Sequence, residues 1–226
     1  MTRTLDVLFR VIGAEVPADH GYALFGAISR ILEREGDGWM HGNTSVGLHT
    51  IRGSPGVPGR YLLGERARFG LRLPAELVPR VLMLAGKSIE LDGCRLRIGV
   101  PQTRALLPAT TLHCRIATTR NGHAPARFDA EIARQAAALD LHGRILRVPL
   151  RAPDGAARDP SRRVVRIRDK RVIGYALLAT ELTAHESIRL QEHGLGGRRR
   201  MGCGVFVPFR PRLWRPRTDA HGRDDR

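Results

Sequence analysis

The order in which the hydrophobic periodicity changes along the chain limits its possible folds more than any other feature. Residues 5–11 alternate between apolar and polar side chains, which predicts a strand. Residues 17–32 then carry apolar side chains at i, i+4, i+7 and i+8, which predicts an amphipathic helix that stops near Gly36. A polar loop, DGWMHGNTS, follows. Next come predicted strands at 46–51, 60–63 and 67–73, a helix at 77–85 and one or two strands at 89–100.

After residue 108 the same order of elements restarts. Residues 111–118 alternate as a strand, and a helix is predicted over 128–141, ending at Gly143. The remaining predictions are a strand at 144–150, a loop at 152–161, a hairpin of 164–168 with 172–180, a helix capped by Thr183, and a last strand at 205–209.

The repeated order predicts an α+β fold of two tandem ferredoxin-like (RRM-like) βαββαβ domains. We expect them at residues 1–105 and 106–212, followed by a disordered basic tail at 213–226. Each domain would be a four-stranded antiparallel sheet with two helices on one face, which leaves a sheet face or the cleft between domains for a ligand. A single α+β domain is the alternative, since strand 144–150 fits the repeat least well.

The charge of the chain predicts a polyanionic partner. Lys and Arg outnumber Asp and Glu by 38 to 22, so the formal net charge is +16. Every basic side chain except Lys87 and Lys170 is arginine, whose planar fork suits phosphate and guanine. A GC-rich codon usage explains the choice of arginine equally well, but it does not explain the net charge.

Three cysteines, far apart and without a CxxC pair, predict neither a disulfide framework nor a zinc site. We therefore expect no metal and no cofactor. The sequence has no apolar run long enough to span a membrane and no charged-then-apolar leader, so we expect a cytoplasmic protein without membrane contact.

The stretch EHGLGGRRRMGCGVFVPF, residues 192–209, is the strongest local motif. It is not a Walker A loop, because arginines follow the glycines; Gly86-Lys87-Ser88 has the right ending, but Val81 replaces the first glycine. A dinucleotide fingerprint needs strand–loop–helix order, and this segment is predicted as helix–loop–strand. The RNA-binding RNP1 pattern fits only in part, since Met201 and Cys203 replace its basic and aromatic positions.

What remains is a loop whose backbone amides approach a sugar–phosphate chain while its arginines neutralise the phosphates. The residues predicted to bind RNA in this way are Gly194, Gly196, Gly197, Arg198, Arg199, Arg200, Gly202 and Gly204.

The glycines follow the spacing G-hydrophobic-G, five residues, G-hydrophobic-G, which resembles the glycine-rich signature of the RAMP superfamily of CRISPR-associated proteins. Residues 16–32 and 172–191 are also similar to its endoribonucleases that process precursor CRISPR RNA. The resemblance implies tandem ferredoxin-like folds and metal-independent cleavage of a CRISPR repeat RNA hairpin. The products would carry 2′,3′-cyclic phosphate and 5′-hydroxyl ends, and the enzyme would stay bound to its product with other subunits of an effector complex.

The resemblance also implies a catalytic histidine in or just after the first helix. His41, in the polar loop, is the first candidate, followed by His49 and His20. Histidine suits the proton transfers because its ordinary pKa is near neutral. Tyr22, Ser29 or Arg30 would supply the second proton transfer or stabilise the phosphorane charge. Plain surface or capping roles are the alternative for each histidine. Five others are expected to be structural or surface residues, with phosphate contact as an alternative for His193 beside the glycine loop: His113, His123, His142, His185 and His193.

Two other functions fit the same pattern. One is a non-catalytic RAMP-type subunit that binds RNA without cleaving it. The other is a tandem RNA-recognition protein for messenger or ribosomal RNA. Because aromatic residues make up only 5% of the chain, recognition is expected to use phosphates and RNA shape more than base stacking.

Overall fold

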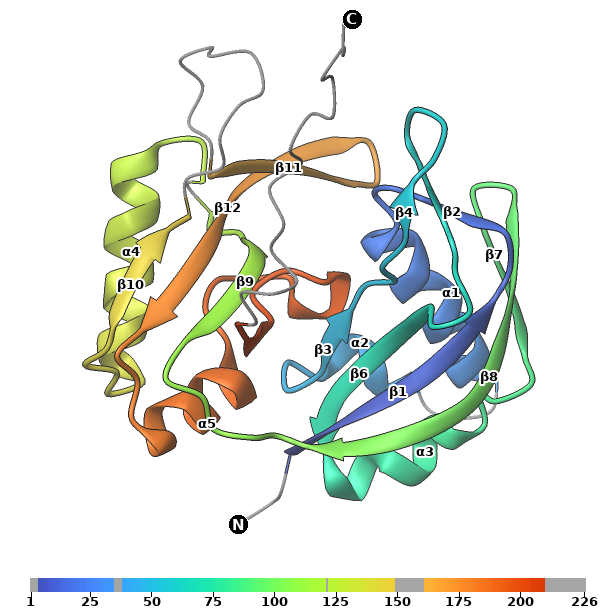
Figure 1. Cartoon of the computed structure of the whole chain (residues 1–226), viewed down its shortest axis with the longest axis horizontal. Helices are drawn as coiled ribbons and strands as arrows, with labels where there is room; N and C mark the ends of the chain where they lie inside the picture. The colour runs from blue at the N-terminus through green and yellow to red at the C-terminus, as the bar shows by residue number, and fades with distance from the viewer. Residues whose placement is uncertain (1–3, 35–37, 121, 149–160, 210–226) are drawn as a thin grey trace, which may run out of the picture.

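The computed structural model describes residues 4–34, 38–120, 122–148 and 161–209. Two antiparallel sheets lie side by side, and the glycine-rich segment runs between them (Figure 1). The predicted tail at 213–226 and the end of the strand predicted at 144–150 fall outside the described residues.

The N-terminal half is a five-stranded sheet whose central strand is β1, between β6 and β8. Its order is β3-β6-β1-β8-β7, and every neighbouring pair is antiparallel. Its elements are β1 (Thr4–Ile12), α1 (Gly21–Arg34), β3 (Gly47–His49), β6 (Arg68–Pro74), the 3₁₀ turn η1 (Ala75–Leu77), α3 (Val78–Leu82), β7 (Ser88–Leu91) and β8 (Cys94–Ala105). Asp92 and Gly93, both with positive φ, form the turn of the predicted 89–100 strand pair.

Two features of this half were not predicted. The strand predicted at 60–63 is present as β5 (Arg60–Leu62), but it pairs with β2 (Glu15–Pro17) and β4 (Ser54–Pro55) in a separate small sheet that was not expected. The segment expected to be a polar loop contains the one-turn helix α2 (Trp39–Gly42). The loop expectation was wrong there because Met40 is buried and Trp39 is partly buried against the same core, so two apolar side chains hold the segment on it.

The C-terminal half repeats the same path. Its sheet order is β10-β12-β9-β13, which matches β3-β6-β1-β8 of the first half, and β11 pairs with the other end of β12. Its elements are β9 (Leu112–Ala117), α4 (Pro125–Ala138), β10 (Arg144–Arg147), β11 (Arg162–Ile167), β12 (Lys170–Thr180), α5 (Ala184–His193), the 3₁₀ turn η2 (Arg199–Met201) and β13 (Phe206–Pro208). The tandem ferredoxin-like fold is confirmed. The strand that seemed superfluous, β10, is the regular second strand, and the additional one is β11.

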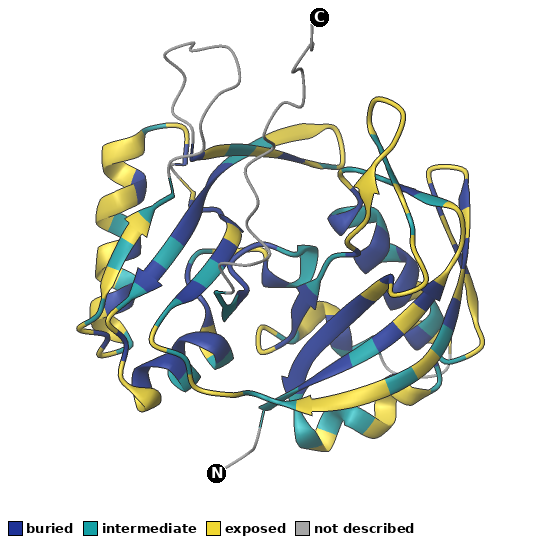
Figure 2. Cartoon of the chain, viewed as in Figure 1, coloured by how far each residue is buried: buried dark blue, intermediate teal, exposed yellow. Residues whose placement is uncertain are grey.

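Each half has its own apolar core (Figure 2). In the first half, Phe9 and Phe69 stack from paired strands, and α1 packs Leu24 and Ile28 against the sheet. In the second, Phe128 of α4 lies with its ring centroid 4.5 Å from that of Tyr175. Two cores, each closed by its own helices, agree with two βαββαβ units.

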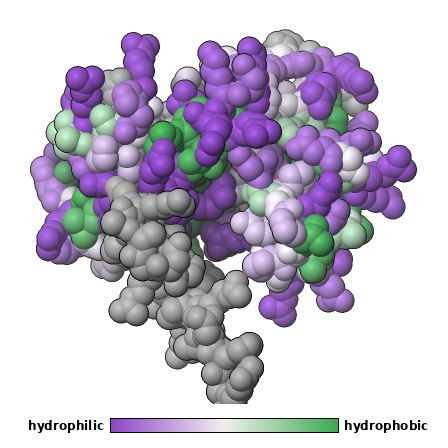
Figure 3. Space-filling view, turned by 90° about the horizontal axis from the view of Figure 1, so that it is seen from above, coloured by the Kyte–Doolittle hydropathy of each residue, from purple (hydrophilic) through white to green (hydrophobic). Residues whose placement is uncertain are grey.

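The β11–β12 hairpin lies at the end of the molecule viewed in Figure 3, where hydrophilic residues cover most of the surface. Basic side chains are frequent on this hairpin, and only Asp169 at its turn is acidic. The basic residues are Arg162, Arg163, Arg166, Arg168, Lys170 and Arg171.

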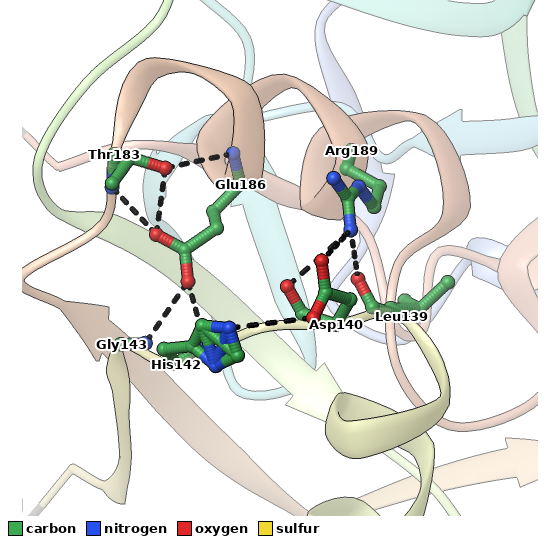
Figure 4. A network of polar contacts seen from close by, with 7 residues as sticks. All are labelled: Leu139, Asp140, His142, Gly143, Thr183, Glu186 and Arg189. Carbon is green, nitrogen blue, oxygen red and sulfur yellow. Dashed lines mark hydrogen bonds and ion pairs between the residues drawn. The ribbon is translucent and has the colours of Figure 1, made fainter.

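A polar network joins α5 to the turn that follows α4 (Figure 4). Thr183 and Glu186 form a capping box at the start of α5, as the sequence predicted for Thr183. The same Glu186 carboxylate accepts hydrogen bonds from the amides of His142 and Gly143 in the turn between α4 and β10. These backbone donors, with Thr183, lower the pKa of Glu186 to about 2.

One arginine joins the two halves. Arg72 of β6 is buried and donates to both carboxylate oxygens of Asp6, at 2.8 and 3.0 Å. Its remaining amino group donates to the carbonyl oxygens of Gln191 at 3.0 Å and Phe206 at 2.6 Å. The first half is thus bonded to the end of α5 and to β13 of the second.

Candidate active site and nucleic-acid interface

The four signature glycines are required by close backbone packing. Gly194, Gly196, Gly202 and Gly204 all have φ between 66° and 83°. A Cβ on Gly194 would lie 2.1 Å from the carbonyl oxygen of Gly204, and a Cβ on Gly204 would lie 2.4 Å from that of Leu195. The two G-x-G turns therefore lie against each other, and only glycine fits at these positions.

The backbone amides of this segment already have partners inside the protein. Those of Gly194, Gly197 and Gly204 donate to carbonyl oxygens of Leu190, Thr118 and Ile116 at 2.7–2.8 Å. The Gly196 amide donates to Gln135 Oε1 at 2.7 Å, and the Gly202 amide donates to the Arg199 carbonyl at 3.1 Å. The expectation that these glycine amides lie against a sugar–phosphate chain is therefore not met. Their hydrogen bonds instead fix the segment between the halves.

The three consecutive arginines point into three different environments. Arg198 is exposed and has φ of 63°. One of its terminal amino groups, Nη1, donates to Thr118 Oγ1 at 3.4 Å. Arg200 reaches back to the first half, where it donates to the Met40 carbonyl oxygen at 3.0 Å. Its guanidinium carbon also lies 5.6 Å from the centre of the Phe25 ring, within cation–π range.

Arg199 is buried between the halves. Its side chain passes Gly47, Gly194 and Gly204, at which any added Cβ would touch it within 3.6 Å. It donates to the Gln191 carbonyl at 3.4 Å, and its Nε has no partner among the described residues. Burial lowers its pKa to about 10, and the nearby Arg72 adds to the effect. Arg199 is therefore held inside the junction, with only 9% of its surface exposed.

His41 is the predicted histidine that the structure leaves most accessible. It lies on α2 with 57% of its side chain exposed, and its Nε2 is 2.5 Å from Glu33 Oε1 of α1. Its ring meets the Phe25 ring edge-on, with centroids 5.2 Å apart. Phe25 thus contacts both His41 and Arg200, so a histidine, a carboxylate and a guanidinium gather on one stretch of α1.

His49 is engaged in the junction between the halves. Its Nε2 lies 3.1 Å from Asp6 Oδ1, the oxygen that Arg72 also binds. Burial lowers the pKa of His49, and Asp6 only partly offsets this. Burial alone would raise the pKa of Asp6, but hydrogen bonds from His49 and Arg72 hold it well below its ordinary value. His49 and His41 therefore have different partners, Asp6 for the first and Glu33 and Phe25 for the second.

His20 uses both ring nitrogens inside the protein. Nδ1 donates to the Pro17 carbonyl at 2.6 Å, and Nε2 accepts from the Ile51 amide at 2.9 Å. These two bonds define a neutral ring, and burial lowers its pKa further. His20 therefore braces the start of α1, which was the structural alternative for this residue.

The predicted partners on α1 differ in access. Tyr22 accepts a hydrogen bond from Arg168 Nε at 3.3 Å, and Arg30 is exposed. Ser29 is buried, and its hydroxyl has no partner among the described residues. Sequence reasoning missed Phe25 and Glu33. Their eight-residue spacing puts both on the Ser29 face of the helix, a signal that was present in the sequence.

A basic surface extends from this region onto the second sheet. Burial lowers the pKa of His113 on β9, and Arg52, Arg163 and Arg115 lower it further through their charges. The charge of Arg115 likewise lowers the pKa of His20. Arg52 of the first half and Arg115 and Arg163 of the second therefore lie close to His113, and Arg52 and Arg115 are exposed, as a polyanion-binding surface requires.

The described residues contain no group of three or more His, Cys, Asp or Glu side chains placed to hold a metal ion. The three cysteines are buried, and burial raises the pKa of Cys203 to about 11. Within the described part of the chain, no helix is both long and apolar enough to cross a membrane.

Comparison with known proteins identifies relatives of the whole arrangement. The family model described as Cas6 Crispr matches residues 5–211. A CRISPR-associated endonuclease Cas6 of Myxococcus xanthus (strain DK1622) is 37% identical over 204 residues, which cover 90% of this chain and 81% of that protein.

Solved structures share the fold at low sequence identity. A CRISPR associated protein Cas6 superposes with a TM-score of 0.64 at 10% identity, over 93% of this chain and all of the other. A Cas6-related protein of Pyrococcus furiosus gives 0.62 at 9% identity, over 92% of this chain and 98% of that one. These likenesses support the tandem ferredoxin-like fold alone.

Proposed function

Because the chain belongs to the Cas6 family, we propose that it is an endoribonuclease that cleaves CRISPR repeat RNA into guide RNAs, with His41 as its proton-transferring residue. The observation that carries the assignment to His41 is the shared contact on Phe25, which brings an exposed histidine and Arg200 together beside Glu33. The N-terminal unit, residues 1–105, supplies the histidine. The second unit, residues 106–212, supplies the arginine through its glycine-rich segment.

The proposed reaction needs only groups that the chain contains. The 2′-oxygen of the RNA attacks the adjacent phosphorus, the bond from phosphorus to the 5′-oxygen breaks, and the products are a 2′,3′-cyclic phosphate and a 5′-hydroxyl. The 2′-hydroxyl proton passes to solvent, and His41 protonates the leaving 5′-oxygen. Glu33 holds the Nε2 side of the ring, so Nδ1 is the nitrogen that faces the RNA. Arg200 stabilises the charge of the phosphorane. We propose that the reaction is independent of metal ions.

Glycines, in this proposal, act on the RNA indirectly. The packed G-x-G turns set the direction of each arginine, and Arg198 and Arg200 make the contacts with phosphate. Cleavage leaves the phosphates outside the scissile bond unchanged, so the same contacts hold the product. This supports an enzyme that keeps its cleaved RNA, and we propose that it acts in the cytoplasm and passes with that RNA into an effector complex with other subunits.

The test uses end-labelled repeat RNA in excess EDTA. We expect the wild-type protein to yield a shorter RNA with a 2′,3′-cyclic phosphate, and to leave intact an RNA that is 2′-deoxy at the cut nucleotide. His41→Ala should slow cleavage by about 10²–10⁴-fold with unchanged RNA affinity. His123→Ala, an exposed histidine of the second half, is the control and should cleave at the wild-type rate.

Cleavage by His41→Ala at the wild-type rate would overturn the assignment of the residue. Tight binding without any cleavage by the wild-type protein would overturn the enzymatic function. It would favour the non-catalytic RAMP-type subunit instead.

A further inference from the structure

The turn of the β11–β12 hairpin reaches from the second half onto the first turn of α1. The backbone amide of Arg166 donates to the carboxylate of Asp19, and Arg168 Nε donates to the Tyr22 hydroxyl at 3.3 Å. Arg168 is exposed, so this contact is made at the surface. No acidic side chain among the described residues pairs with its guanidinium.

Arg168 has the left-handed backbone conformation, with φ of 56°. Glycine and asparagine adopt that conformation with less strain than arginine does. The two-residue turn that joins Ile167 to its partner Lys170 requires such a conformation. The turn places the Arg168 side chain at the tip of the hairpin, where its guanidinium meets α1 at Tyr22.

The hydrogen bond to Tyr22 uses only one nitrogen of the Arg168 guanidinium, which leaves the other two available to a ligand. Nε is used, while the two terminal amino groups of Arg168 have no partner among the described residues. Because the Tyr22 oxygen accepts from Arg168, its own O–H is free to donate elsewhere. Two guanidinium N–H groups and one phenol O–H are the donors that a phosphate binds best.

We propose that Arg168 and Tyr22 form a second phosphate-binding site for the RNA, next to the site of cleavage. Tyr22 is three residues before Phe25 on α1, so the two side chains are neighbours on one helix face. The pair therefore lies one helical turn from Phe25, the residue that His41 and Arg200 contact, and it takes a phosphate near the scissile one. The placement next to cleavage rests on the proposed function, whereas the binding of a phosphate does not.

The experiment measures binding to repeat RNA that is 2′-deoxy at the cut nucleotide, as a function of salt concentration. Losing one phosphate contact on single-stranded RNA reduces the slope of log K against log salt by about 0.7. We expect that reduction for Arg168→Met. Arg168→Lys should keep the slope and lose affinity, because a lysine retains the charge but not the fork. Tyr22→Phe should also keep the slope while weakening binding.

Arg134→Met is the charge-matched control, since Arg134 lies on α4 and pairs with Glu131. It should match the wild-type slope. An unchanged slope for Arg168→Met, in a variant whose melting temperature equals that of the wild type, would overturn the proposal. If the wild type fails to cleave unmodified RNA, the proposed function fails while the slope still decides the role of Arg168.

Discussion

Helices α1 and α4 hold the same place in the repeated path, but only α1 is covered on both sides. Seven of the 14 residues of α1 are buried, against three of 14 in α4 (Figure 2). Besides its own sheet, α1 contacts α2, the glycine-rich segment and the turn of the β11–β12 hairpin. The comparison teaches that the candidate site is formed where loops of the second half cover a helix of the first.

The three consecutive arginines, residues 198–200, have different environments because the turn that carries them has a fixed conformation. Arg199, Arg200 and Met201 form a 3₁₀ turn, in which consecutive side chains point about 120° apart. Arg199 therefore points into the junction, and Arg200 points to α1. Without the fixed turn, all three arginines would be ordinary surface charges.

The largest effect is expected from breaking the junction itself. Arg72→Met leaves the Asp6 carboxylate buried without its guanidinium, and losing one partner of a buried pair reduces the free energy of unfolding by about 3–5 kcal/mol. Arg199→Met is the matched control on the same Gln191 carbonyl. Arg199 has no carboxylate partner among the described residues, so its replacement should leave stability unchanged or raised.

Urea unfolding of both variants at pH 7 is the measurement. Equal losses of stability would show that Arg199 also bonds the halves together. The distinction between a paired and an unpaired buried arginine would then fail.

A smaller effect is expected from removing the arginine that reaches α1 from the second half. Arg200→Met removes one charged donor from the proposed transition state, and cleavage at saturating RNA should slow by about 10²–10³-fold. Arg198→Met, its exposed neighbour, should weaken RNA binding without changing the rate at saturation. Single-turnover cleavage over a range of protein concentrations separates the two. A rate loss for Arg198→Met equal to that for Arg200→Met would contradict the assigned positions.

The fold could be predicted from the sequence because the hydrophobic periodicity of each unit depends only on residues close together in the chain. The alternation of β1, the stripe of α1 and the Thr183 cap are local signals, and the structure contains all three. His41 was also placed correctly on the segment after α1. Whether it is catalytic stays a prediction.

The junction could not be predicted, since it depends on contacts between residues far apart in the chain. Arg72 and Gln191 are 119 positions apart, and Arg168 and Tyr22 are 146 apart. The glycines were misread for the same reason. Their left-handed turns could be expected, but the sequence could not say that their amides face carbonyl groups of Ile116 and Thr118.

The smallest effect is expected on the side of α4 and α5, away from the candidate site. Glu186→Gln weakens the cap of α5 and its bonds to the α4–β10 turn, which should reduce the free energy of unfolding by about 1–2 kcal/mol at pH 7 (Figure 4). RNA cleavage should be unchanged, because none of these contacts reaches α1. Slower cleavage by this variant would show that the outer side of the second half also shapes the site.

The same variant should lose part of the acid sensitivity of the fold. The pKa of Glu186 is lowered from 4.5 to about 2 in the folded chain, so its stabilisation is complete above pH 4.5 and is lost as the pH falls toward 2. The stability difference between wild type and Glu186→Gln should therefore shrink over that window. Denaturant unfolding at pH 7, 4.5 and 3 measures it. A difference that stays constant down to pH 3 would mean that the carboxylate charge contributes nothing beyond the shape of the side chain.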